Sequence, residues 1–175
     1  GKGYVIISDK LNHASIIDGC KLSQAAFRVY PHNNMEKLEK ILIKSECFRR
    51  KMIVTDTVFS MDGDLAPLKS IVDLAKKYNA MTMVDEAHAT GIFGVNRRGV
   101  LEHLGLEGKV DVVMGTLSKA VGSIGGYVCG NNNLIAYLRN KAKSFIYTTA
   151  LPPAVCAASI AGLKIIEEKP ELTDS

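Results

Sequence analysis

The 175-residue sequence lacks several features that mark whole classes of protein. It has no tryptophan and only 6% aromatic residues, so any buried core has to be built from aliphatic side chains. The most apolar stretch, Leu151–Leu163, is shorter than the roughly 20 residues that a membrane-spanning helix needs. No charged segment followed by a long apolar run opens the chain. We therefore expect neither a secretion signal nor a membrane partner.

A large charge of one sign and paired cysteines are also missing. The formal net charge is only +4, and the densest basic cluster, Arg49–Lys51, is typical of a solvated edge, which argues against nucleic-acid binding. No CxxC pair and no histidines at ligand spacing occur, so neither a zinc site nor a disulfide framework is expected. Isolated cysteines in apolar surroundings are typically buried and reduced, which favours a cytoplasmic location. They are Cys20, Cys47, Cys129 and Cys156.

Short apolar runs alternate with helical patterns along the chain. The runs predict strands that are apolar on both faces, as in a sheet covered by helices on both sides. They are Tyr4–Ile7, Val29–Tyr30, Met52–Thr55, Met81–Val84, Val110–Met114 and Tyr127–Cys129. This order predicts a single domain of the α/β class, with three layers and a mostly parallel sheet wound by right-handed crossovers.

Apolar residues at helical spacing predict four helices between and after these strands. Their apolar positions begin at Met35, Leu68, Leu134 and Pro152 or Pro153. Asn33 lies three residues before Glu36, a spacing that predicts a capping box at the start of the first of these helices. Pro67 is suited to the first turn of the second.

Polar residues follow three consecutive predicted strands, at the edge of an α/β sheet where ligands bind. They are Asp56 and Ser60, then Asp85, Glu86 and His88, then Gly115, Thr116, Ser118 and Lys119. Asp85 directly follows an apolar strand and is expected to be partly buried, so it needs a cationic or hydrogen-bonding partner. A single aspartate there is equally typical of a helix cap or a salt bridge. The convergence of polar groups predicts a ligand site.

Lys119 is unusual because it follows a strand and lies among small residues, with Gly122–Gly126 close behind. In a partly desolvated pocket its amine would lose proton affinity and could form a Schiff base. Taken alone, it also fits a surface lysine on a glycine-rich turn. The glycine run precedes a strand, so it is not a dinucleotide-binding fingerprint. The segment Asp62–Asp64 lacks the other oxygen ligands of a calcium loop and predicts an acidic turn, and we expect no metal.

Five segments together resemble the α-oxoamine synthase family, a group of fold-type I enzymes that depend on pyridoxal 5'-phosphate (PLP). They are Asn12–Ser15, Phe59–Gly63, Val84–His88, Gly115–Lys119 and Leu151–Ala154, in the order found in the family and across essentially the whole chain. The resemblance implies that residues 1–175 form the central part of the PLP-binding large domain. An upstream glycine-rich loop and a C-terminal small domain, with an arginine for the substrate carboxylate, would then be missing, and this piece alone should have little or no activity.

The resemblance also implies roles for individual residues. The catalytic residues would be Lys119, which carries PLP and moves the Cα proton, and His13, which stacks on the ring. Asp85 would pair with the ring nitrogen and keep it protonated, so that the ring acts as an electron sink. His88 would approach the phenolic oxygen of the ring.

Further contacts with PLP are implied at hydroxyl groups. Ser60 would lie near the cofactor, and Thr116 would hold its phosphate. In the family the site lies at the interface of a homodimer. A hydroxyl of Thr148 or Thr149 would therefore contact the phosphate bound by the partner subunit.

The implied reaction condenses an amino acid with an acyl-CoA or acyl-carrier thioester and releases carbon dioxide. The segments look most similar to the branch that condenses L-alanine with a pimeloyl thioester in biotin synthesis, and next to the branch that uses glycine and acetyl-CoA. An aminotransferase would keep Asp85 and Lys119 but would not be expected to show His13 in this motif. An inactive partner subunit would lack Lys119, and a plain nucleotide-binding module leaves both Asp85 and Lys119 unexplained.

Overall fold

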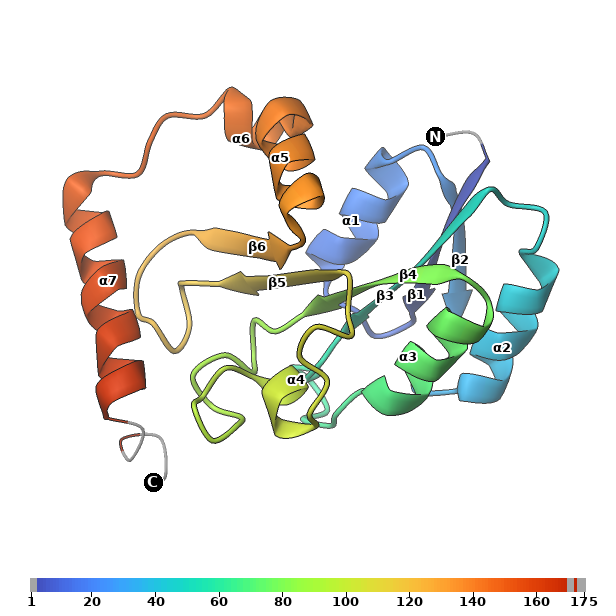
Figure 1. Ribbon diagram of the computed structural model, residues 1–175, viewed down its shortest axis with the longest axis horizontal. Helices are drawn as coiled ribbons and strands as arrows, with labels where there is room; N and C mark the ends of the chain where they lie inside the picture. The colour runs from blue at the N-terminus through green and yellow to red at the C-terminus, as the bar shows by residue number, and fades with distance from the viewer. Residues whose placement is uncertain (1–2, 170–171, 173–175) are drawn as a thin grey trace.

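The computed structural model describes residues 3–169 and residue 172, which form an α/β fold around one six-stranded sheet (Figure 1). The strands are β1 (Tyr4–Asp9), β2 (Ala26–Tyr30), β3 (Arg50–Asp56), β4 (Ala80–Asp85), β5 (Val112–Thr116) and β6 (Gly126–Gly130). Their order in the sheet is β2-β1-β3-β4-β5-β6. Neighbouring strands are parallel except β5 and β6, which are antiparallel. The predicted mostly parallel sheet is confirmed.

All six predicted strands are present, but their ends differ from the prediction. The first four are longer at one or both ends, and β3 and β4 continue to Asp56 and Asp85. The fifth, predicted at Val110–Met114, lies two residues later, so that Thr116 is its last residue. The ends matter because they place Asp56, Asp85 and Thr116 on strand residues, while the other polar groups of the predicted site lie on the loops that follow.

The helices are α1 (Ala14–Leu22), α2 (Met35–Lys44), α3 (Leu68–Lys77), α4 (Val100–His103), α5 (Asn132–Lys141), α6 (Lys143–Ile146) and α7 (Pro153–Glu168). The four predicted helices are confirmed as α2, α3, α5 and α7. Sequence reasoning missed α1 and the two short helices α4 and α6. Only Ile16 and Cys20 of α1 are buried, so its helical pattern is weak.

The predicted capping box at Asn33 and Glu36 is wrong. Helix α2 is capped one residue later by Asn34, whose side-chain oxygen accepts a hydrogen bond from the Lys37 backbone N–H. Asn33 instead has a positive φ of 53°, and its side-chain amide donates to Asp64. An asparagine tolerates this left-handed conformation and can use its amide elsewhere, which the spacing alone does not reveal.

Helices cover both faces of the sheet, which confirms the three-layer arrangement. Helices α2, α3 and α4 lie on one face, while α1, α5 and α6 lie on the other (Figure 1). The larger core lies under α2–α4 and includes Ile7, Leu38 and Ile71. A smaller cluster joins Ile16 and Cys20 of α1 to Val54. Each fully buried side chain of this size contributes about 1.5–3 kcal/mol to stability.

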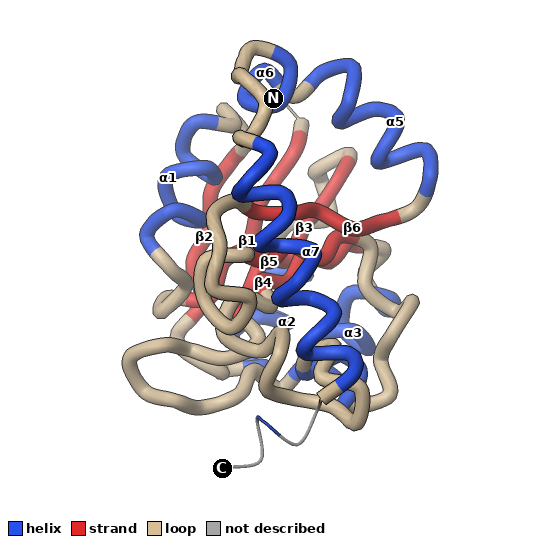
Figure 2. Tube along the Cα trace, turned by 90° about the vertical axis from the view of Figure 1, so that its left-hand side faces the viewer, coloured by secondary structure: helices blue, strands red, loops and turns tan. Residues whose placement is uncertain are grey.

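Helix α7 stands beyond the carboxyl end of β5, away from the layers formed by α1 and α2–α3 (Figure 2). Within the described part of the chain, no helix is long and apolar enough to cross a membrane. The four cysteines are free, but only Cys20 is buried. The expectation of buried thiols is therefore wrong for Cys47, Cys129 and Cys156. Cys129 lies on the edge strand β6, and Cys156 lies on α7, most of which is exposed.

Candidate active site

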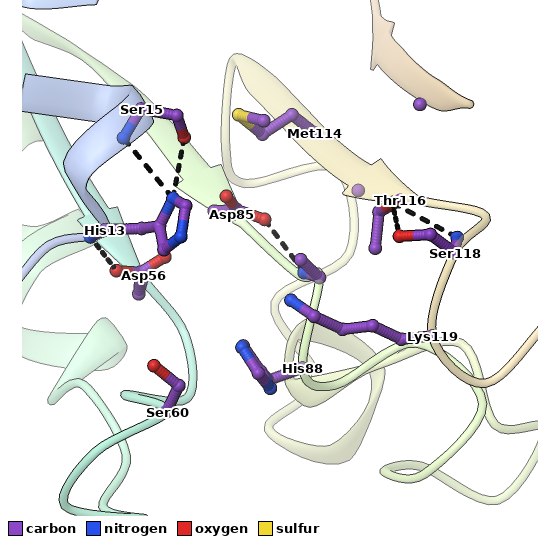
Figure 3. A pocket seen from close by; sticks show the side chains of 13 residues that line it. His13, Ser15, Asp56, Ser60, Asp85, His88, Met114, Thr116, Ser118 and Lys119 are labelled. Carbon is purple, nitrogen blue, oxygen red and sulfur yellow. Dashed lines mark hydrogen bonds between the residues drawn. The ribbon is translucent and has the colours of Figure 1, made fainter. Parts of the chain in front are cut away.

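A pocket of about 390 Å³ lies at the carboxyl ends of the parallel strands (Figure 3). Its lining includes six of the seven residues predicted for the site, namely His13, Ser60, Asp85, His88, Thr116 and Lys119. The other lining residues are Ser15, Asp56, Ala87, Met114, Gly115, Ser118 and Gly126. The volume falls in the usual range for small-molecule sites.

The parallel register explains why side chains from distant parts of the sequence meet here. Asp56 at the end of β3 pairs with Asp85 of β4, and Asp85 pairs with Met114 of β5. Residues at one register position of adjacent parallel strands point to the same face of a sheet. The chain folds these three residues into one wall of the pocket.

Asp85 is buried, with 6% of its surface exposed. One carboxylate oxygen accepts a 2.8 Å hydrogen bond from the backbone N–H of Ala87, where the chain leaves β4. The partner that sequence reasoning required is therefore a backbone N–H of the following turn. The side chain lines the pocket between His13 and Lys119 (Figure 3).

Glu86 anchors the loop that follows β4 and faces away from the pocket. Its carboxylate accepts hydrogen bonds from the Thr57 hydroxyl and from the backbone N–H groups of Val100 and Leu101. Burial raises the pKa of Glu86, and these hydrogen bonds oppose the rise. The loop that carries His88 is thereby tied to the start of α4.

His88 is partly buried and lies beside Lys119 (Figure 3). Burial lowers the pKa of its imidazole, the positive charge of Lys119 lowers it further, and Asp85 opposes this change. A lowered pKa keeps the ring neutral at pH 7. A neutral imidazole can donate one hydrogen bond and accept another, so His88 can bind a polar oxygen in the pocket.

His13 is the N-cap residue of α1, and both its backbone and its ring are held. The ring nitrogen Nδ1 lies 2.8 Å from the Ser15 hydroxyl and accepts a longer bond from the Ser15 backbone N–H. The His13 backbone N–H donates to an Asp56 carboxylate oxygen at 2.8 Å. The imidazole is thus fixed on the pocket wall across from Lys119 (Figure 3).

Asp56 is a buried pocket residue that the sequence placed at the ligand-binding edge but to which the resemblance assigned no role. Burial raises its pKa to about 6, and the nearby Asp85 carboxylate adds to the rise. The bond from His13 and the charges of His13 and Lys119 oppose it. Its place directly after an apolar strand, as for Asp85, was the signal available in the sequence.

Thr116 and Ser118 bring two hydroxyl groups together at the end of β5. The Thr116 hydroxyl lies 2.7 Å from that of Ser118, accepts from the Ser118 backbone N–H and donates to the Gly125 carbonyl. Two further backbone bonds, Leu117 N–H to Gly125 and Ser123 N–H to Leu117, close this loop. Hydroxyl groups of this kind can bind an oxyanion.

Lys119 lies on the same loop and is exposed in the described chain. The expectation of a partly desolvated amine is not met here, because the loop projects past the strand ends. Close packing nevertheless holds the loop from two sides. A Cβ atom on Gly91 would lie 2.5 Å from that of Ala120, and one on Gly162 of α7 would lie 2.6 Å from the Val121 carbonyl oxygen.

The remaining predicted residues lie in different settings. Ser60 is exposed at the pocket, on a turn closed by hydrogen bonds from Phe59 N–H to Asp64 and from Gly63 N–H to Phe59. Thr148 and Thr149 are exposed between α6 and α7 and do not line the pocket. A contact of either hydroxyl with the site of a partner subunit stays a prediction.

A group of possible metal ligands, His32, Asp62 and Asp64, lies in the described chain outside the pocket. The two ring nitrogens of His32 already lie 3.0 Å from an Asp9 oxygen and 2.8 Å from an Asp64 oxygen. A histidine bonded at both nitrogens has no lone pair free for a metal. The group therefore reads as a structural ion pair.

The sequence pattern of the aminotransferase class I and II family matches residues 1–175. The chain belongs to this family. It is 54% identical, over 98% of its length, to the 8-amino-7-oxononanoate synthase of Thermoanaerobacter pseudethanolicus. It spans only 44% of that relative, so it corresponds to less than half of the relative's length.

Solved structures of related enzymes also match nearly the whole chain. A serine palmitoyltransferase from Sphingomonas wittichii superimposes with a TM-score of 0.95 at 40% identity, over 99% of this chain and 44% of the other. A second serine palmitoyltransferase, solved with a PLP internal aldimine, has a TM-score of 0.92 at 42% identity over the same shares. The resemblance to α-oxoamine synthases and the fold-type I architecture are confirmed.

Proposed function

We propose that the pocket at the carboxyl edge of the sheet binds PLP in an enzyme that condenses an amino acid with an acyl thioester. The carbon dioxide of the amino acid is released. The preferred substrates are L-alanine and a pimeloyl thioester, the pair that the sequence resemblance implies for relatives named 8-amino-7-oxononanoate synthase. The observation that carries the proposal is the convergence of Asp85, Lys119 and His13 on one pocket. Each of them comes from a different strand end.

The donors and acceptors of the pocket suit PLP. Two carboxylates, a primary amine, two imidazoles and four hydroxyl groups line one cavity. When bound, PLP supplies an electron-withdrawing ring that stabilises negative charge on the Cα atom of an amino acid. These group types match the ring nitrogen, aldehyde, aromatic face and phosphate of that cofactor.

Asp85 would hold the ring nitrogen. Its carboxylate is buried and already oriented by the Ala87 N–H, so little ordering remains to be done on binding. A carboxylate that accepts from the nitrogen favours its protonated form. Asp85 therefore sets how strongly the pocket can draw electrons from a bound amino acid.

Lys119 and His13 would act on protons. Lys119 supplies the primary amine, the group that attaches PLP covalently and can take a proton from Cα as a general base. His13, fixed by Ser15 and Asp56, faces the pocket from the opposite wall. From there its imidazole would pack on the ring and pass protons to substrate oxygens.

The phosphate would lie at the end of β5. Thr116 and Ser118 offer hydroxyl groups there, and Gly126 lets the backbone come close. A Cβ atom at Gly126 would lie 3.2 Å from the Gly115 carbonyl oxygen, so a larger residue would crowd this corner. Ser60 and His88 would bind on the other side, with His88 near the phenolic oxygen.

The assembly is also part of the proposal. The 175 residues would be the central part of the PLP-binding domain of a longer chain, since they span 44% of a curated relative. The protein would act as a cytoplasmic homodimer, in which exposed Thr149, or its neighbour Thr148, reaches the partner's phosphate site. Four free cysteines agree with a reducing compartment.

The test is a thioester-cleavage assay on the full-length protein. Free thiol and carbon dioxide would be measured with alanine or glycine, against pimeloyl- or acetyl-thioesters. We expect alanine with pimeloyl thioester to react fastest, and Lys119→Ala to lower the rate by about 10²–10⁴-fold, the range for loss of an acid–base group. The exposed Lys109→Ala is the matched control. No product from any pair would contradict the proposal, and turnover by residues 1–175 alone would contradict the need for the remaining chain.

A further inference from the structure

The roles proposed for the other pocket residues do not explain the buried environment of the Asp56 carboxylate. It is 6% exposed, lines the pocket, and lies at the same register position as Asp85 on the adjacent strand. Two carboxylates therefore lie side by side on one wall. Burying a carboxylate is costly, and a second negative charge beside it adds to the cost. Such arrangements gather at functional sites.

The fold does not need this carboxylate to join the β1–α1 loop to β3. The side chain of Asn12 already makes that connection, donating to the Val54 carbonyl and accepting from the Asp56 backbone N–H. Asn12 also donates to the Ser8 hydroxyl. The Asp56 side chain adds a single contact with the loop, its bond from the His13 N–H. An uncharged amide could accept that bond equally well.

We infer that Asp56 is a positioning residue of the PLP site, which holds His13 at the start of α1 and supplies a second negative charge beside Asp85. The inference rests on the proposed function. Holding the His13 backbone fixes where the imidazole can stand, because Ser15 already fixes its rotation. The hydrogen bond from the His13 backbone N–H fixes the position of His13, and the ionised carboxylate of Asp56 supplies the negative charge.

The charge acts on every ionisable group around it. Three of them face Asp56: His13 from the start of α1, Asp85 from β4, and Lys119 from the loop after β5. A negative charge here favours protonated cations across the pocket and disfavours a second anion. The raised pKa of Asp56, about 6, follows from its burial and from Asp85. The carboxylate is therefore mostly ionised at pH 7 but close to its midpoint.

Two substitutions separate position from charge. Asp56→Asn keeps an acceptor for His13 and removes the charge, whereas Asp56→Ala removes both. Asp73→Asn, on the exposed side of α3, is the matched control. All are made in the full-length protein, with three measurements: the dissociation constant for PLP, the pH midpoint of the bound cofactor's visible absorbance, and the denaturation midpoint against pH.

We expect Asp56→Asn to keep PLP affinity within about threefold and to move the absorbance midpoint to lower pH, since a charge that favours protonation is gone. Asp56→Ala should in addition weaken PLP binding about tenfold, the effect of one hydrogen bond to a charged group. Asp56→Asn should also be more stable than the wild type above pH 6, where the buried carboxylate is ionised. The Asp73 control should change none of these.

The failures can be told apart. If the wild type binds PLP on Lys119 while both variants keep its affinity and midpoint, Asp56 has no role in positioning, and the proposed function stands. If both variants weaken binding equally without moving the midpoint, the role is structural only, and the inference is overturned. If the wild type takes up no PLP on Lys119, the proposed function fails and the inference fails with it.

Discussion

The chain up to Val121 is packed far more tightly than the chain after it. Residues 3–121 contain a continuous core with fully buried side chains such as Ile7, Leu38 and Leu42. Among the described residues after Val121, only Ser159 is buried. Large apolar side chains are exposed there, including Phe145 at 62% and Tyr147 at 81%.

The pocket lies on the boundary between these two parts. His13, Asp56 and Asp85 belong to the tightly packed part, where backbone and side-chain hydrogen bonds fix them. Lys119 lies near the end of the tightly packed part, on a loop that continues past Val121 into the loosely packed part. Helix α7 holds that loop on one side. The Ser159 hydroxyl donates a hydrogen bond to the Ser123 hydroxyl, and Gly162 packs closely against the Val121 carbonyl. Substitutions in the first part should lower stability, and those at the boundary should alter the site.

The largest expected effect is on stability in the tightly packed part. Ile7→Ala should lower the free energy of unfolding by about 2–5 kcal/mol, because Ile7 is fully buried in β1 and a cavity would remain. Ile160→Ala in α7, where the side chain is 57% exposed, should cost less than about 0.5 kcal/mol. Urea unfolding of the 175-residue chain compares the two. If both variants lost the same free energy of unfolding, the two parts of the chain would not differ in how much their packing contributes to stability.

A smaller effect is expected where α7 meets the Lys119 loop. Gly162→Ala would place a Cβ atom 2.6 Å from the Val121 carbonyl oxygen, a clash that should cost about 1–3 kcal/mol and weaken PLP binding. Gly19→Ala in α1 meets nothing within 4 Å, and should stabilise the chain by up to about 1 kcal/mol. Calorimetry and a PLP titration of the full-length variants measure both. Unchanged PLP affinity in Gly162→Ala would show that α7 does not place the loop.

A pH-dependent effect is expected at His32, inside the tightly packed part. Burial lowers the pKa of its imidazole, but the hydrogen bonds and charges of Asp9 and Asp64 outweigh it, and the net pKa is raised. A raised histidine pKa adds stability that is complete below the unfolded value, about 6.5, and is lost as pH rises through the folded value.

His32→Gln tests this directly. The variant should be less stable than the wild type, most of all at pH 5.5, and the gap should narrow by pH 9, as measured by urea midpoints. The exposed His103→Gln is the control and should show no such trend. A gap that widens with increasing pH would mean that the charged form of His32 is not the stabilising one.

The smallest effect is expected at the surface of α2. Lys40 pairs with Glu36 one turn earlier, and both side chains are exposed. Solvent and salt screen such pairs, so Lys40→Ala should leave the urea midpoint within measurement error. A clear loss of stability would show that exposed ion pairs, and not only buried apolar side chains, stabilise the tightly packed part.

Much of the fold and site could be predicted from the sequence, because apolar runs and the polar residues that follow them along the chain are local signals. The strands, four helices and five of the predicted residues that line the pocket follow from these signals, while His13 came only from the resemblance to the α-oxoamine synthases. Tertiary contacts decided the rest. Helix α1 hides its pattern because only Ile16 and Cys20 face the sheet. Asp56 gains its setting from His13, which is far away in sequence. The exposure of Lys119 depends on how little covers its loop, which no local pattern records.

The most direct test of this account is to find which lysine carries the cofactor. The full-length protein would be incubated with PLP, reduced with borohydride and digested, and the modified peptide identified by mass spectrometry. We expect one modified residue, Lys119, with no label in Lys119→Ala and full label in the Lys109→Ala control. Label on another lysine, or none in the wild-type protein, would contradict the assignment of this pocket as a PLP site.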